Sequence, residues 1–154
     1  EITTRLVGSE MCIRDRDITG TLQKLWRCML QNLPENLPYT EHSKLERNRM
    51  REIMDYLEYN YMNKIQMKDI AEEIHLCESE CSRLFKRYMN VSLFTFLQEY
   101  RVERSLEFLL SSDDSIMEVA QKSGFTDSNY YAKIFSRVKG CSPQKYRKQN
   151  TKKE

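Results

Sequence analysis

Residues 116–147 read IMEVAQKSGFTDSNYYAKIFSRVKGCSPQKYR, and the spacing of apolar residues in this stretch decides the fold class. Apolar side chains recur every three or four positions, which predicts helices rather than strands. Ser115 and Glu118 have the spacing of a capping box, so a helix is predicted over 116–123. Gly124 ends that helix, because glycine tolerates the backbone conformation of a tight turn.

A longer helix follows directly in the same stretch. Asp127 is a good N-cap for it, and Gly140 provides a left-handed stop. The two helices and the turn between them form a helix-turn-helix motif over 116–138. Ser142 followed by Pro143 then predicts the start of a last short helix.

The same arrangement occurs a second time, earlier in the chain. Residues 69–71 (DIA) match residues 118–120 (EVA) at an offset of 49, and positions after the turn match at an offset of 50. Helices are therefore predicted over 67–74 and 78–89, which together form a first motif over 67–89. In both motifs an alanine stands where the two helices must approach closely.

A long helix is predicted over 93–110, between the two motifs, with Phe94 on its inward side. At ~1.5 Å per residue it is roughly 27 Å long. Ser43 and Glu46 have capping-box spacing and open a further helix before the first motif. No segment shows sustained alternation of apolar and polar residues, so the fold class is predicted to be all-α. These helices define one domain over 43–148.

The two ends of the chain are interpreted separately. Residues 6–16 (LVGSEMCIRDR) resemble translated sequencing-adapter read-through, so 1–16 is expected to be non-native or a disordered terminus. Residues 17–42 are read as an amphipathic helix at 18–31 and a linker. The helix needs a partner surface, which could be the domain that follows, a second copy of the chain, or an upstream sensing or dimerising domain of which it would be the remnant; the last two are favoured. Residues 149–154 form a polar tail.

Composition narrows the class of protein. The chain has 154 residues, with 25 Lys and Arg against 23 Asp and Glu, and only 4 Gly and 3 Pro. Scarce Gly and Pro argue against a turn-rich β-sandwich or barrel. No segment approaches the ~20 apolar residues of a membrane span, and five scattered Cys fit reduced thiols in the cytoplasm.

No enzymatic constellation is found among the known catalytic motifs, and no cofactor is expected. His75, Cys77 and Cys81 form an H-x-C-x3-C cluster. Because structural zinc needs four closely spaced ligands, roles in the turn and the core are favoured and no metal is expected.

Positive charge gathers on the second helix of each motif and on the residues after it. Over 127–154, eight Lys and Arg accompany only Asp127 and Glu154. Over 83–104, five Arg and Lys accompany two Glu. The first helices of the motifs are acidic by contrast, so the small net charge hides a polarity that fits nucleic-acid binding.

The residues of the second motif resemble the signature of the AraC/XylS family of bacterial transcription regulators. The resemblance covers about 49–148. It rests on 116–120 (IMEVA), 124–127 (GFTD), 130–131 (YY), Phe135, Gly140 and 142–147 (SPQKYR), and the stretch 101–110 resembles the linker helix of the family. It implies two homeodomain-like helix-turn-helix subdomains rigidly joined by the linker helix. Each subdomain would present its second helix to one of two successive major grooves, which lie ~34 Å apart on one face of B-DNA.

Three positions depart from the usual residues of the family. His75 stands at a usual Gly and Cys77 at a usual Ser cap, so the first motif is expected to be the less stable one. Ser105 stands at a usual Ala and is expected to cost little.

Helix periodicity and the resemblance together give the candidate DNA contacts. The base-reading candidates lie on the outward face of each second helix: Ser79, Ser82, Arg83, Ser128, Asn129 and Lys133. The phosphate-contact candidates are the nearby cations Lys86, Arg87, Arg137, Lys139 and Lys145. Arg101 lies on the inward stripe of the linker helix and is interpreted as a structural ion-pairing residue.

The expected function is therefore a sequence-specific DNA-binding transcription regulator, an activator by analogy with the family. Its expected partners are double-stranded DNA, RNA polymerase and, through an upstream domain, a second copy of the chain. The alternative is a helical protein–protein adaptor with no DNA binding, in which the basic helices meet an acidic partner.

Overall fold

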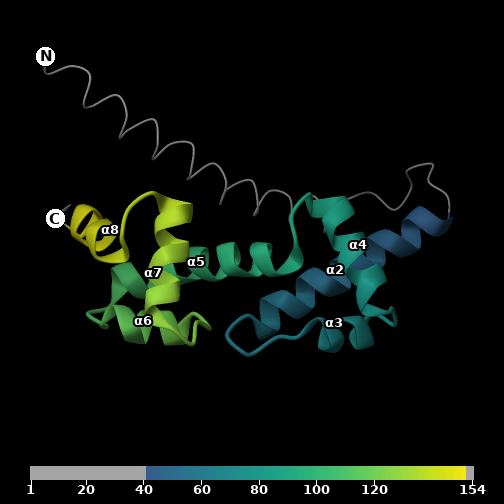
Figure 1. The fold of residues 1–154 in the computed structure, drawn as a ribbon, viewed down its shortest axis with the longest axis horizontal. Coiled ribbons are helices and arrows are strands. Elements are labelled where there is room, and N and C mark those ends of the chain that lie inside the picture. The colour runs from purple at the N-terminus through teal and green to yellow at the C-terminus, as the bar shows by residue number, and fades with distance from the viewer. Residues whose placement is uncertain (1–40, 152–154) are drawn as a thin grey trace, which may run out of the picture. The chain divides into compact units, whose positions relative to one another are not determined.

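The computed structural model describes residues 41–151, with side chains from residue 44 onward, and these residues form helices without strands (Figure 1). The helices are α2 (Glu41–Asn60), α3 (Met67–Glu73), α4 (Glu78–Met89), α5 (Leu93–Ser111), α6 (Ile116–Lys122), α7 (Ser128–Lys139) and α8 (Pro143–Asn150). The all-α prediction is confirmed. The predicted helix 18–31 and the interpretation of 1–16 lie outside the described residues.

The chain divides into two compact units, and the division falls inside α5, between Leu97 and Gln98. In the described part, the first unit holds α2, α3, α4 and the start of α5. The second unit holds the rest of α5 with α6, α7 and α8. Each unit therefore contains one complete helix-turn-helix motif.

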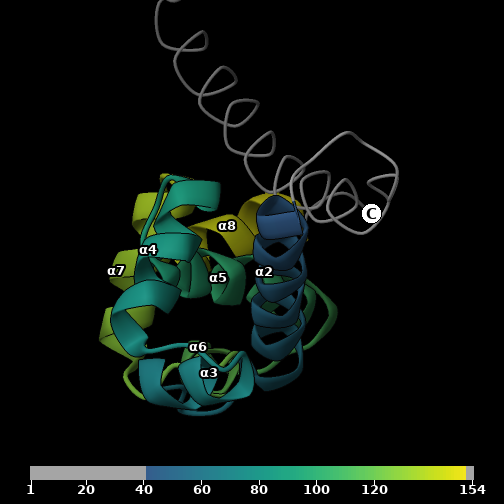
Figure 2. The same ribbon diagram turned by 90° about the vertical axis from the view of Figure 1, so that its right-hand side faces the viewer.

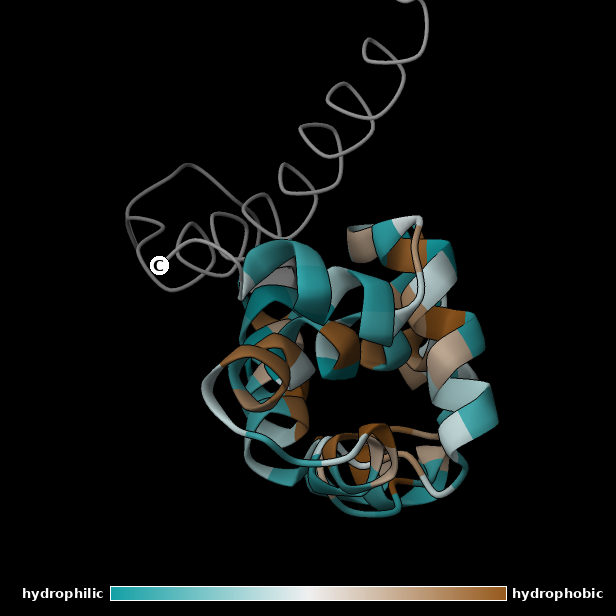
Figure 3. Ribbon diagram, turned by 90° about the vertical axis from the view of Figure 1, so that its left-hand side faces the viewer, coloured by the Kyte–Doolittle hydropathy of each residue, from teal (hydrophilic) through white to brown (hydrophobic). Residues whose placement is uncertain are grey.

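In the first unit, α2, α3 and α4 pack against one another (Figure 2). The apolar face of α2 is fully buried at Met50 and Ile53, and Ile70 of α3 and Phe85 of α4 are equally buried. The ring of Phe85 meets the ring of Phe96 edge-on, with centroids 5.5 Å apart. Figure 3 shows hydrophobic (brown) and hydrophilic (teal) residues on the same helical ribbons, as expected for helices with one buried face.

In the second unit, a row of aromatic rings fills the core. Phe125 lies 5.1 Å from Tyr131, Tyr131 lies 5.6 Å from Phe135, and Phe135 lies 5.5 Å from Tyr146, measured between ring centroids. The last two contacts are edge-on, the arrangement that aromatic quadrupoles favour. Val102 of α5 is fully buried in the same cluster.

The turn between the two motif helices has the same geometry in both units. The amide of Leu76 donates to the carbonyl of Ala71, and the amide of Phe125 donates to the carbonyl of Ala120, both over 2.9 Å. The residue before each amide has a positive φ, 55° at His75 and 84° at Gly124. The repeat seen in the sequence is therefore a repeat of backbone structure.

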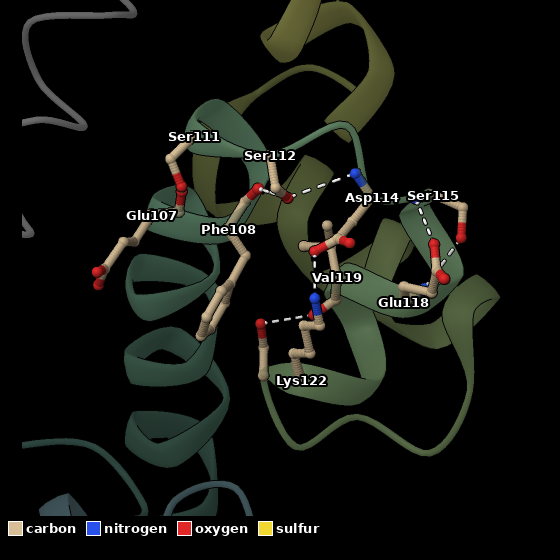
Figure 4. Close-up of polar contacts among 10 residues, drawn as sticks. Glu107, Phe108, Ser111, Ser112, Asp114, Ser115, Glu118, Val119 and Lys122 are labelled. Atoms are coloured by element: carbon tan, nitrogen blue, oxygen red, sulfur yellow. Dashed lines mark hydrogen bonds and ion pairs between the residues drawn. The ribbon is translucent and has the colours of Figure 1, made fainter.

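The connection between α5 and α6 is fixed by polar contacts of its serines and acids (Figure 4). The hydroxyl of Ser112 donates to the carbonyl of Phe108 over 2.7 Å. Ser115 and Glu118 form the predicted capping box, with the Ser115 amide 2.7 Å from the Glu118 carboxylate. These bonds hold the pKa of Glu118 below its ordinary value. Lys122 at the end of α6 donates to Asp114 over 2.5 Å.

Two local predictions are wrong. Ser43 does not cap α2, because α2 already begins at Glu41. Phe94 was predicted inward but is 40% exposed, while Leu93 and Phe96 are buried in its place. Helix α4 ends at Asn90 in a left-handed conformation, with φ 58° and ψ 9°.

A buried polar contact joins α5 to α7. The hydroxyl of Ser105 donates to the carbonyl of Val102 over 2.6 Å and lies 2.9 Å from the hydroxyl of Tyr131. Because the single serine proton goes to the carbonyl, Tyr131 is the donor to Ser105. Burial raises the pKa of Tyr131 to about 12, so it keeps that proton at neutral pH.

We expect His75→Gly to raise the free energy of unfolding by about 0.5–1 kcal/mol. A residue with a β-carbon is strained in the left-handed conformation, and glycine is not. Glycine also increases the conformational entropy of the unfolded chain, but this loss of stability is smaller than the gain from removing the strain. Urea denaturation followed by circular dichroism measures the change. His75→Ala is the matched control and should gain nothing, while Gly124→Ala at the equivalent position should destabilise. A His75→Gly variant no more stable than His75→Ala would contradict the strain assignment.

We expect Ser105→Ala to lower the free energy of unfolding by about 1–3 kcal/mol, because it leaves the Tyr131 hydroxyl buried without this partner. Thermal and urea denaturation measure the loss. The double variant Ser105→Ala/Tyr131→Phe should lose less than the sum of the two single variants. Additive losses would show that the two hydroxyls are not coupled.

Candidate nucleic-acid interface

The second helix of the first motif, α4, turns a polar face outward. Ser79, Ser82 and Arg83 are exposed, whereas Cys81 and Phe85 on the opposite face are fully buried. All three base-reading candidates on this helix are therefore accessible side chains close to its N-terminus. Lys86, one turn beyond Ser82, is exposed as well.

Arg87 also belongs to the exposed side of α4, but it has a partner. Its Nη1 lies 2.7 Å from Oε1 of Glu46 on α2, and the Arg87 side chain remains 63% exposed. Glu46 further accepts a 3.4 Å bond from the hydroxyl of Tyr88. Glu46 thus ties α2 to α4.

The second helix of the second motif, α7, has the same division of faces. Asn129, Lys133 and Arg137 are exposed, and Ser128 is half-buried. Tyr131 and Phe135 on the other face are fully buried. The three exposed side chains follow one another at four-residue spacing, so they form a single row along the helix.

The two helices differ in their N-caps. The carboxylate of Asp127 accepts the amides of Asn129 and Tyr130 over 2.6 and 3.0 Å. At Cys77 the cap is weaker, since its amide reaches the Glu80 carboxylate at 3.5 Å and its thiol lies 3.2 Å from the same oxygen. These contacts hold the pKa of Glu80 below its ordinary value. The weaker cap at Cys77 is the structural consequence of having cysteine in place of the usual serine.

The prediction that Lys139 contacts phosphate is corrected by its burial. The Lys139 side chain is 3% exposed, and its Nζ lies 2.8 Å from Oε1 of Glu103 on α5. Lys139 follows Phe135 by four residues, so it shares the buried face of α7. The four-residue spacing from Phe135 was therefore the signal in the sequence that Lys139 is buried.

The remaining cations divide between surface and core. Lys145 on α8 is exposed. The guanidinium of Arg101 is half-buried over the ring of Phe125, 5.9 Å from its centroid, and burial lowers its pKa. This cation–π contact gives Arg101 a structural position. Arg147 donates from Nε to the carbonyl of Leu109 over 2.9 Å, which satisfies a carbonyl near the end of α5.

One exposed side chain near the predicted contacts was not among the DNA-contact candidates. Tyr130, between Asn129 and the buried Tyr131, is 44% exposed. Its hydroxyl lies 2.6 Å from Nε2 of Gln98 on α5. Its position in the first turn of α7 was a signal that it lies near the predicted contacts. The hydrogen bond to Gln98 could not be predicted, because that partner lies 32 residues away in the sequence.

The H-x-C-x3-C cluster does not converge on one point. His75 and Cys77 are exposed, whereas Cys81 is fully buried and its burial raises the pKa of its thiol to about 11. Across residues 41–151, no group of three or more His, Cys, Asp or Glu side chains is arranged to hold a metal ion. None of the helices in that range has the length and apolar character needed to cross a membrane.

Comparison with known proteins gives consistent matches. A family model described as a helix-turn-helix domain matches residues 70–149. YdeC of Bacillus subtilis, an uncharacterized HTH-type transcriptional regulator, is 28% identical over 96% of this chain and 50% of its own length. The HTH-type transcriptional activator RhaR of Mannheimia succiniciproducens is 29% identical over 77% of this chain and 41% of its own length.

Solved structures share the fold. The C-terminal domain of AraT, a response regulator from Geobacillus stearothermophilus, has a TM-score of 0.64 at 25% identity, covering 69% of this chain and 88% of that domain. The chain spans half the length, or less, of the curated relatives named above. With a helix-turn-helix domain matched over residues 70–149 and two such motifs in the structure, the chain belongs to the AraC/XylS family of helix-turn-helix transcription regulators.

Proposed function

We propose that this chain is the DNA-binding part of a transcription regulator that recognises a specific DNA sequence in two successive major grooves. The observation that carries the proposal is the repeated turn, which is followed in each unit by a helix with an exposed polar and basic row. The helix after such a turn is the one that enters the major groove in helix-turn-helix proteins.

The proposed base contacts are the exposed or half-buried side chains near the N-terminal ends of α4 and α7. They are Ser79, Ser82, Arg83, Ser128, Asn129 and Lys133. The Arg83 guanidinium suits the paired acceptors O6 and N7 of guanine, and the Asn129 amide suits N6 and N7 of adenine. The proposed phosphate contacts are Lys86, Arg87, Arg137 and Lys145, without Lys139.

The proposal of two grooves rests on the presence of two motifs in one chain and on the linker helix. Helix α5 is continuous over 19 residues, about 28 Å at ~1.5 Å per residue. One chain would then cover an asymmetric site of about two turns of DNA.

The regulatory role is proposed from the relatives. One of them is described as a transcriptional activator, which supports activation through contact with RNA polymerase. Because the relatives are longer than this chain, an upstream domain for ligand sensing or dimerisation is also proposed, as is a place of action in the cytoplasm. The alternative of a protein–protein adaptor is not favoured, because the family match is to DNA-binding regulators.

Binding to random and selected duplexes tests the proposal. We expect the chain to enrich a duplex from a random library, to protect about two turns of it from cleavage, and to bind more weakly as salt rises. Gel shift at two salt concentrations and hydroxyl-radical footprinting measure these properties. Absence of binding at both salt concentrations would favour the protein–protein adaptor. Protection of a single turn of DNA would contradict binding in a second major groove.

Substitutions on the exposed rows test the base contacts. We expect Arg83→Ala and Lys133→Ala each to weaken binding to the enriched duplex by about 1–3 kcal/mol, with a smaller effect on a scrambled duplex. Lys145→Ala is the matched control, because loss of a phosphate contact should weaken both duplexes alike and reduce the salt slope by about 0.9. Equal losses on both duplexes for Arg83→Ala and Lys133→Ala would assign these residues to phosphate instead.

A further inference from the structure

A buried ion pair ties the C-terminal end of α7 to α5. Nζ of Lys139 lies 2.8 Å from Oε1 and 3.0 Å from Oε2 of Glu103, so the ammonium meets both carboxylate oxygens. The Lys139 side chain is 3% exposed and that of Glu103 is 17% exposed. A charge removed from water to this degree is tolerated only with its partner in place.

The other end of α7 is held to the same helix by neutral hydrogen bonds. The hydroxyl of Tyr131 meets Ser105 at 2.9 Å, and the hydroxyl of Tyr130 meets Gln98 at 2.6 Å. Apolar packing alone tolerates small rotations of a helix about its axis, because such contacts have little directional preference. Polar contacts near both ends of α7 resist that rotation, because they require defined distances and angles.

We propose that Glu103 and Lys139 are a positioning pair that fixes the rotation of α7 on α5, and with it the direction in which Asn129 and Lys133 point. This inference rests on the proposed function, since it gives the pair a role in the recognition of bases. Lys139 then affects base recognition by holding α7 in place, and it makes no contact with a DNA phosphate. Its charge is already neutralised by Glu103, and Phe135 one turn earlier is fully buried on the same face.

Salt dependence of binding separates positioning from direct contact. The probes are the duplex that the native chain enriches from a random library and a scrambled duplex of the same composition. We expect Lys139→Met and Glu103→Gln each to reduce discrimination between the two duplexes by about tenfold, the value of one base contact. The salt slope should stay that of the native chain, because no phosphate contact is lost.

The double variant and a conservative variant complete the binding test. Glu103→Gln/Lys139→Met should lose no more discrimination than either single variant, because both remove the same pair. Lys139→Arg should retain most of it. A salt slope reduced by about 0.9 in Lys139→Met, as expected for Lys145→Ala, would overturn the proposal in favour of a phosphate contact. Unchanged discrimination in Glu103→Gln, or additive losses in the double variant, would overturn it too.

Hydrogen exchange in the DNA-free chain tests the pair without any assumption about function. We expect Glu103→Gln, the mildest change, to increase the exchange of α7 amides while leaving the amides of α4 in the other unit unchanged. Unchanged exchange in α7 would overturn the positioning role even if the chain binds DNA. If exchange increases but the native chain enriches no duplex, the pair still holds α7 and the proposed function is what has failed.

Discussion

The constraint on which the rest of the structure depends is the backbone hydrogen bond that runs from the residue after the turn of each motif back to an alanine on the first helix. In both units the residue after the turn donates to an alanine on the first helix over 2.9 Å, which requires the preceding residue to have a positive φ. Alanine leaves room for that approach. Once the turn is closed, the direction of the second helix is set, and its apolar positions meet the core while its polar row faces solvent.

Short-range signals account for most of what could be predicted from the sequence. The bounds of α4 follow from the position of Cys77 and the left-handed stop at Asn90, and those of α7 from Asp127 and Gly140, because caps and stops act within one turn. The exposed row of α7 follows from helical periodicity alone. The same periodicity puts Lys139 on the buried face, four residues after Phe135. Its ion pair could not be predicted in this way, since the partner Glu103 belongs to another helix, 36 residues away.

The two motifs reach the same backbone with different local chemistry. The first accepts His75 in a left-handed conformation and begins its second helix after Cys77, whose amide and thiol meet Glu80, while the second uses Gly124 and the carboxylate of Asp127. The second also has a row of aromatic rings in its core, and the hydroxyl of one of them, Tyr131, is held by Ser105. The serine at this position therefore serves a buried hydrogen bond and is more than a tolerated substitute for alanine.

The buried pair between Glu103 and Lys139 limits how the chain could be re-engineered. Recognition helices are attractive units for building chimeric regulators, because their outward side chains can be exchanged independently of the scaffold. In this chain α7 is not such a unit. A helix grafted from another protein without a cation at position 139 would leave the carboxylate of Glu103 largely buried without its partner. The residue at position 103 must therefore be exchanged together with the helix.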